Sequence, residues 1–214
     1  MRALVAGDWV VSLAAAGSAP TLERVILNQH RRGDAWAPLL RLETARGAAL
    51  TVTPDHVLML DGAFTAAARA APGSLTSAGA VVAIRPSAGS VVNPVTTSGT
   101  ILVSDAAAPR EPVLAATHPE WVAPLLLAAP SLVLPATRLA SRVAPATTQV
   151  AYEALEPALA AATPHLQRYA AVAPATLPAG VAVADAGFAV AVLAYALAVP
   201  FGLTGVALIL VARK

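Results

Sequence analysis

The sequence predicts a mainly β fold for the first part of the chain, then an Ala- and Pro-rich, partly helical connector, and finally one apolar α-helix. Three observations predict it. Short β-branched runs separated by Gly or Pro fill residues 1–118, Ala and Pro dominate residues 119–187, and residues 188–212 contain no charged side chain. These three ranges are the expected domains.

The composition excludes several classes of protein. Only 12% of the 214 residues are charged and 57% are hydrophobic, which argues against intrinsic disorder and against a wholly soluble globule. The absence of cysteine excludes a disulfide framework, a thiolate zinc site and a cysteine nucleophile within this chain. The 14 Lys and Arg residues are dispersed, so no nucleic-acid partner is expected.

The clearest predicted element of the β region is a hairpin at residues 40–53. Leu40 and Leu42 alternate with charged residues, and Leu50 and Val52 alternate with threonines, on either side of a Gly-containing turn. Further short strands are expected at 24–27, 57–60, 81–84, 91–92 and 100–103, separated by turn signals such as Arg85-Pro86. Many short strands at this spacing favour a compact all-β unit, and an irregular Ala-rich chain is the alternative.

The connector contains two segments of interest. Residues 122–134 are apolar but too few to span a bilayer and are interrupted by prolines, so a buried edge, a surface flap and an interfacial segment all stay open. From Gln149 to about Tyr169 we expect a broken helix, in which Pro157 and Pro164 set turns.

The uncharged stretch 188–212 predicts a transmembrane helix. At about 1.5 Å per residue it exceeds the roughly 30 Å hydrocarbon core, and a buried core helix is the alternative. Arg213 and Lys214 favour a cytosolic C-terminus. A single-pass protein is therefore expected, with membrane lipid around 188–212 and an extracellular or lumenal N-terminal part.

That topology requires translocation, yet no clear signal peptide is present. Asp8 interrupts the apolar run that follows Arg2 after only a few residues. Either the protein is tail-anchored, or the chain lacks its true N-terminus.

Residues 42–57, which read L-E-T-A-R-G-A-A-L-T-V-T-P-D-H-V, resemble the Hint domain of hedgehog proteins and inteins. Leu4–Val10 is similar to the family's L-x-x-G-D-x-V stretch, and residues 93–103 are similar to its P-x-T-x-x-G-T strand. The likeness also includes 25–31 and 64–67, and so covers roughly residues 3–118. The occurrence of these motifs in order makes the resemblance more specific than T-x-x-H alone.

The resemblance implies self-cleavage by an N–S acyl shift followed by thioester cleavage. In such domains a first-residue cysteine attacks the preceding carbonyl, and a second nucleophile, a sterol in hedgehog proteins or a side chain in inteins, cleaves the thioester. It implies that His56 protonates the leaving nitrogen and that Thr53 holds it through its hydroxyl. The substrate would be the chain's own upstream segment, and no cofactor or metal is implied. Without the resemblance, His56 is a satisfied histidine at a strand end.

The departures from the family pattern are as important as the matches. Gly7-Asp8 lies six residues from Met1, so the family's opening strands and cysteine are absent, and we expect a truncated or degenerate copy that is inactive as it stands. His30 stands where hedgehog proteins carry the aspartate that activates the sterol. His30 could act as a base toward water or a side chain, but sterol transfer is not expected; a surface residue beside Arg31 is the alternative. Thr117 or His118 stands near the family's second cysteine.

Other chemistries find little support. The phosphate-binding, dinucleotide-binding, zinc-protease and serine-hydrolase motifs are absent, and the four histidines are too scattered in sequence to indicate a metal site. The sequence therefore predicts a Hint-type self-processing domain. The alternative is a membrane-anchored, non-catalytic β-domain for binding or scaffolding.

Overall fold

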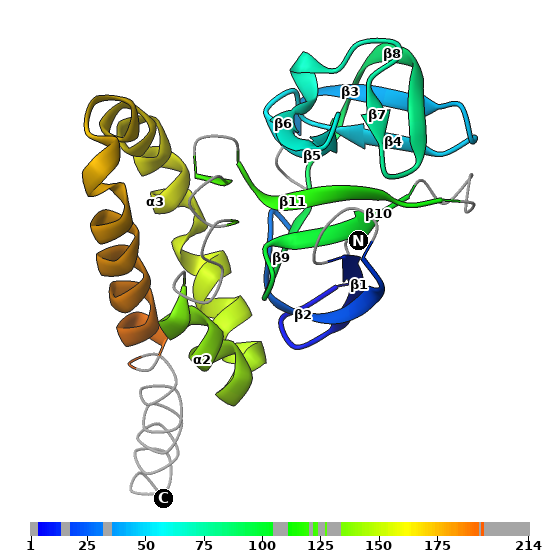
Figure 1. The fold of residues 1–214 in the computed structure, drawn as a ribbon. Helices are drawn as coiled ribbons and strands as arrows, with labels where there is room; N and C mark the ends of the chain where they lie inside the picture. The colour runs from blue at the N-terminus through cyan, green and yellow to red at the C-terminus, as the bar shows by residue number, and fades with distance from the viewer. Residues whose placement is uncertain are drawn as a thin grey trace, which may run out of the picture. The chain divides into compact units, whose positions relative to one another are not determined.

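A computed structural model of the protein describes residues 4–13, 18–31, 36–104, 111–119, 122–123, 127, 134–192 and 194. The chain divides into two compact units, residues 1–133 and 134–214, called here the β unit and the helical unit. The β unit holds three antiparallel sheets and the helical unit holds α-helices (Figure 1). The prediction of a mainly β chain with a helical part is therefore confirmed.

Antiparallel pairing builds all three sheets of the β unit. The first sheet contains, in spatial order, β1 (Trp9–Leu13), β2 (Pro20–Gln29) and β9 (Asn93–Thr96). The second contains β10 (Thr100–Val103), β11 (Val113–Pro119), β5 (His56–Leu60) and β6 (Ala63–Ala66). The third contains β4 (Ala49–Val52), β3 (Trp36–Thr44), β8 (Gly79–Ser90) and β7 (Leu75–Thr76). A short 3₁₀ helix, η1 (Ala67–Arg69), follows β6.

The predicted hairpin at residues 40–53 is confirmed as β3 and β4. Leu40 pairs with Val52 and Leu42 with Leu50, so the apolar side chains of both strands share one face. Leu42 and Leu50 are buried on that face. Gly47, in the turn, has a φ of 80°, a left-handed conformation that glycine adopts without strain.

Two of the predicted strand limits are wrong. β8 does not end at Arg85-Pro86 but continues to Ser90, and residues 91–92 lie in no strand. β8 continues because Pro86 pairs with Leu40 of β3 on one side, whereas the pairing of β7 on the other side ends at Ala80. A proline, which lacks an N–H, is tolerated at such a free edge. The other predicted runs lie within β2, β5, β8 and β10.

The core of the β unit is shared by strands of the second and third sheets. Its fully buried members include Leu58 of β5, Ala115 of β11 and Val81 of β8. β5 and β11 are neighbours in the middle of the second sheet and carry continuous apolar runs, 57–60 and 113–116. Such runs are typical of strands that are covered on both faces, and every residue of both runs is buried.

The helical unit contains α2 (Pro135–Val143), α3 (Pro145–Val172) and η3 (Pro174–Thr176), after which residues 177–192 are helical. The expectation that Pro157 and Pro164 set turns is wrong, because α3 continues through both. The two prolines are seven residues apart and both are exposed, so they lie on one solvent-facing side. Water can hydrogen-bond the carbonyls that the prolines leave without a donor, and the helix persists.

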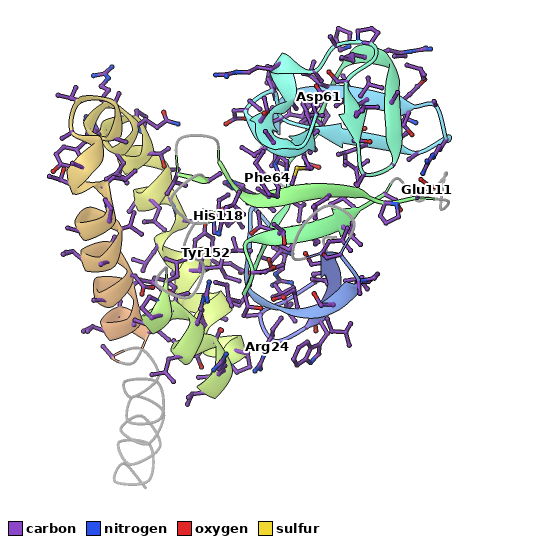
Figure 2. The ribbon with its side chains drawn as sticks, viewed as in Figure 1. Arg24, Asp61, Phe64, Glu111, His118 and Tyr152 are labelled. Carbon is purple, nitrogen blue, oxygen red and sulfur yellow. The ribbon has the colours of Figure 1, made fainter. Side chains whose placement is uncertain are left out.

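Two contacts join the helices of this unit. The buried carboxylate of Asp185 accepts hydrogen bonds from the backbone N–H groups of Ala136 (2.8 Å) and Thr137 (2.9 Å), and so caps the start of α2. The rings of Tyr152, labelled in Figure 2, and Phe188 meet edge to face with their centroids 6.4 Å apart. The helix at 177–192 is thereby attached to both α2 and α3.

The predicted membrane helix at 188–212 lies outside the described residues, apart from 188–192 and 194, which are helical. Within the described part of the chain, no helix is long and apolar enough to cross a membrane. Most of the apolar run 122–134 also falls outside the described residues. The single-pass topology therefore stays a prediction.

Candidate functional site

Thr53 and His56 are the two ends of a tight turn between β4 and β5. The backbone N–H of His56 donates to the carbonyl oxygen of Thr53 at 3.1 Å, and Pro54 occupies the second position of the turn, where its restricted φ is favoured. The carbonyl of Pro54 accepts a hydrogen bond of 2.7 Å from the N–H of Ala68, which attaches the turn to η1. The turn alone therefore brings Thr53 and His56 close together.

Both residues line a cavity of about 270 Å³ in the β unit. The cavity has polar groups in an otherwise aliphatic wall, and strands of all three sheets contribute to it. Its polar lining residues are Thr51, Thr53, His56, Ser90 and Asn93. Its apolar lining residues are Leu39, Leu50, Val52, Val91, Val92, Pro94, Ile101 and Val103.

The environment of His56 favours a neutral imidazole. Burial lowers the pKa of His56 below its ordinary value of 6.5, because it disfavours the charged form, while the carboxylate of Asp55 acts more weakly in the opposite direction. The imidazole makes no hydrogen bond to any residue that the structure describes. Near pH 7, His56 can therefore accept a proton at one ring nitrogen and donate one from the other.

Asn93, at the start of β9, is a site residue that the sequence analysis missed. Its Nδ2 donates to Oε1 of Gln29 at 2.7 Å and to the carbonyl oxygen of Thr117 at 3.0 Å. Both amide hydrogens are thus engaged, and Oδ1 is left as the hydrogen-bond acceptor of this cavity residue. The available signal was the position of Asn93 at the start of the stretch 93–103.

His30 is not among the residues that line the cavity. It follows the end of β2 with a φ of 54°, a left-handed conformation that is uncommon for a side-chain-bearing residue. Its neighbour Gln29 holds Asn93 through the hydrogen bond described above. His30 is therefore the sequence neighbour of Gln29, which holds a residue of the cavity lining. Of the three predicted site residues, only Thr53 and His56 line the cavity.

The Gly7-Asp8 pair has a structural explanation. Gly7 has a φ of 103°, and its N–H donates to the carbonyl oxygen of Val25 at 2.8 Å. The N–H of Val25 donates in return to the carbonyl oxygen of Asp8 at 2.8 Å, and the Asp8 carboxylate accepts from the N–H of Val5 at 2.9 Å. This turn joins the start of β1 to β2, so the pair is accounted for by folding alone.

Thr117 and His118, on β11, are also outside the cavity lining. Thr117 is fully buried, and its hydroxyl accepts a hydrogen bond of 3.4 Å from the N–H of Thr96. His118, labelled in Figure 2, packs against Gly99, where an added Cβ would lie 3.4 Å from the imidazole Cδ2, an ordinary van der Waals distance. Both residues serve the packing of the strands.

No protein-family model and no curated protein matches this chain. Within the described ranges, no three His, Asp or Glu side chains are grouped as a metal ion requires. The function is therefore argued from the cavity and from the motifs that meet in it.

Proposed function

We propose that the cavity at Thr53 and His56 is the peptide-activating site of a Hint-type self-processing domain. One observation carries the proposal: residues from two separate motif stretches line the same cavity. Thr53 and His56 come from the stretch 42–57, and Asn93 comes from the stretch 93–103. Convergence of both stretches on one partly polar cavity is what a shared chemical role requires.

The proposed reaction is an acyl shift at a peptide bond placed in the cavity. A thiol sulfur bonds to the carbonyl carbon, the carbon–nitrogen bond breaks, and the nitrogen leaves as an amine. Neutral His56 accepts the thiol proton and donates a proton to the leaving nitrogen, while the Thr53 hydroxyl hydrogen-bonds the same peptide group. A second nucleophile, water or a side chain, then attacks the thioester carbon and displaces the thiolate.

The size of the cavity supports a peptide rather than a sterol as the occupant. Its volume of about 270 Å³ lies below the range of about 300–1,000 Å³ typical of small-molecule sites. The aliphatic part of the wall strengthens electrostatic interactions with a bound amide, because apolar side chains lower the local dielectric constant. The chain contains no cysteine, so the attacking thiol would belong to a segment joined upstream, and this chain alone would hold a peptide without cleaving it.

The test joins a segment that supplies a cysteine upstream of residue 1 and follows release of that segment by electrophoresis. We expect His56→Gln, which keeps the size of the side chain, to slow release by about 10²–10⁴-fold, the usual contribution of general acid–base catalysis. Thr53→Val should also slow it, whereas Thr53→Ser, which keeps the hydroxyl, should largely preserve it.

The control for this experiment is His165→Gln, at an exposed histidine of α3, which should release the segment at the parent rate. Each variant is checked for folding by its amide NMR spectrum. Equal release rates for folded His56→Gln and the parent protein would refute the proposed role of His56.

A membrane-anchored, non-catalytic β-domain is the second candidate, and the absence of cysteine favours it. In that case the cavity binds an extended peptide and leaves it intact. If the protein with the added upstream segment releases nothing and His56→Gln only weakens peptide binding, this second function is the correct one.

A further inference from the structure

The side-chain amide of Asn93 is held in one orientation. Its Nδ2 donates to Oε1 of Gln29 at 2.7 Å and to the backbone carbonyl oxygen of Thr117 at 3.0 Å. A backbone carbonyl oxygen can only accept a hydrogen bond, so the NH₂ group must face Thr117. If the amide were turned over, two oxygen atoms would oppose each other there. The position of Oδ1 is therefore fixed.

Both residues that hold Asn93 are themselves well placed. Gln29 lies directly opposite Asn93 in the pairing of β2 with β9. Thr117 of β11 is fully buried, and its N–H donates to the carbonyl oxygen of Gly99 at 2.8 Å. Asn93 is thus supported from two strands besides its own. An atom that is positioned before a ligand arrives binds that ligand with a smaller loss of conformational entropy.

The Oδ1 atom is the end of this amide that is left for a ligand. It accepts no hydrogen bond within the described part of the chain, and it is accessible to solvent. Asn93 lines the cavity, whereas Gln29 and Thr117 do not. The NH₂ group is therefore engaged outside the lining, and Oδ1 is the acceptor that Asn93 offers to an occupant.

The lining of the cavity suits a ligand that is polar but uncharged. It contains no Asp, Glu, Lys or Arg, so neither a cation nor an anion would meet one of these charged side chains. Thr53 adds a hydroxyl that can donate a hydrogen bond and that forms none with the residues the structure describes. One acceptor and one donor in a largely aliphatic wall match the single N–H and the carbonyl oxygen of a secondary amide.

We propose that Asn93 makes the cavity selective for secondary amides, because its Oδ1 accepts the amide N–H. The Thr53 hydroxyl donates to the carbonyl oxygen of the same group. An ester of the same shape has no N–H, so it would leave Oδ1 desolvated and without a hydrogen bond. The inference rests on the proposed function, since it takes a peptide group as the occupant, and it adds the residue that recognises the nitrogen.

The contact should matter most while the peptide bond breaks. When His56 donates its proton to the nitrogen, the N–H that faces Oδ1 of Asn93 becomes more positively charged and a stronger hydrogen-bond donor. The amine that leaves keeps an N–H for the same oxygen. Asn93 is therefore expected to affect the rate of release as well as binding.

The test measures the binding of two small probes to the full chain, which contains no cysteine thiol to attack them. The probes are N-butylbutanamide, a secondary amide, and butyl butanoate, the corresponding ester, and NMR titration gives both dissociation constants. We expect the preference for the amide to be about 2–10-fold greater in the parent protein than in Asn93→Leu, the effect of one hydrogen bond. In the parent protein, the side-chain carbonyl carbon of Asn93 should shift with the amide and not with the ester.

Two variants separate recognition of the amide from support of the cavity wall. Asn93→Leu removes the acceptor and should weaken amide binding while ester binding changes little. Gln29→Leu removes one support but leaves Asn93 held by Thr117, and should keep the amide preference. If both variants weaken the binding of both probes alike, Asn93 has only a structural role and the proposal is wrong. Gln167→Leu, at an exposed glutamine of α3, is the control and should bind both probes as the parent does.

The release experiment separates failure of this inference from failure of the proposed function. With the upstream segment added, Asn93→Leu should slow release by about tenfold, because a hydrogen bond to a group that is becoming charged is stronger than a neutral one. Release at the parent rate in Asn93→Leu, with slow release in His56→Gln, would refute the role of Asn93 alone. An equal response of the Asn93 carbon to amide and ester, or to neither, would also refute it.

Discussion

His56 combines two properties that suit a histidine with a chemical role. It lies in an aliphatic cavity that lowers the pKa of its imidazole, and it makes no hydrogen bond within the described residues. The imidazole nitrogens are therefore available to a group that enters the cavity. Asn93 adds a second group with unused bonding capacity, at Oδ1.

The lowered pKa of His56 predicts how stability depends on pH. Because folded His56 binds the proton less readily than the unfolded chain, its contribution to the free energy of unfolding should be constant above about pH 6.5, fall as the pH decreases below that value, and level off below the folded pKa. Urea unfolding at a series of pH values measures this dependence, and NMR titration gives the pKa itself. His56→Gln should remove that part of the slope. A His56 pKa at or above 6.5 would contradict the prediction.

The hydroxyl of Thr100 predicts a large effect for a small change. This buried Oγ1 lies 2.7 Å from Oγ of Ser12 and donates to the carbonyl of Leu13 at 3.1 Å, and so links the first and second sheets. Thr100→Val should lower the free energy of unfolding by about 1–3 kcal/mol, because it leaves buried partners unsatisfied. Thr21→Val, at an exposed threonine of β2, should change it little in the same urea experiment.

At the scale of elements, α3 shows how solvent exposure decides the effect of a helix-breaking residue. Pro157 and Pro164 are inside the helix, yet both face water, and α3 is continuous. In contrast, Pro145 stands at the start of α3, where the missing N–H has no intrahelical partner to lose.

This difference predicts opposite outcomes for proline replacement. Pro157→Ala and Pro164→Ala should each raise helix stability, by up to about 3 kcal/mol, because each restores a backbone hydrogen bond and removes a steric clash. Pro145→Ala should have little effect. Hydrogen exchange of α3 amides measures all three, and slower exchange in Pro145→Ala than in the other two variants would contradict this account.

At the scale of the whole molecule, the two units differ in how they are stabilised. The β unit has a large core that includes the fully buried Leu58, whereas a smaller described cluster of the helical unit comprises Ala140, Ala151 and Val192. Larger side chains bury more apolar area, so the β unit should be the more resistant to unfolding.

Two core variants test this difference. Leu58→Ala should lower the unfolding free energy of the β unit by about 2–5 kcal/mol, and its amides should lose protection from hydrogen exchange. Protection of the helical unit should change little, because residues 1–133 and 134–214 form two compact units that each hold their own internal contacts. Equal loss of protection in both units would show that they unfold as one.

The sequence by itself determined the features that depend on neighbouring residues. Alternation of apolar and polar side chains predicted the hairpin β3–β4, and the mainly β class followed from short runs between turn residues. The T-P-D-H stretch determined a tight turn, because proline favours the second position of such turns. These are interactions between residues a few positions apart, which a sequence displays directly.

Only the tertiary structure decided which distant segments meet. The cavity is formed by strands of three sheets, and neither the presence of Asn93 in its lining nor the absence of His30 from it could be deduced from spacing. The continuity of β8 through Pro86 and of α3 through Pro157 was likewise decided by the free edge and the exposed side that these prolines occupy. Burial and edge position depend on long-range packing, and the same residue type has different effects in different surroundings.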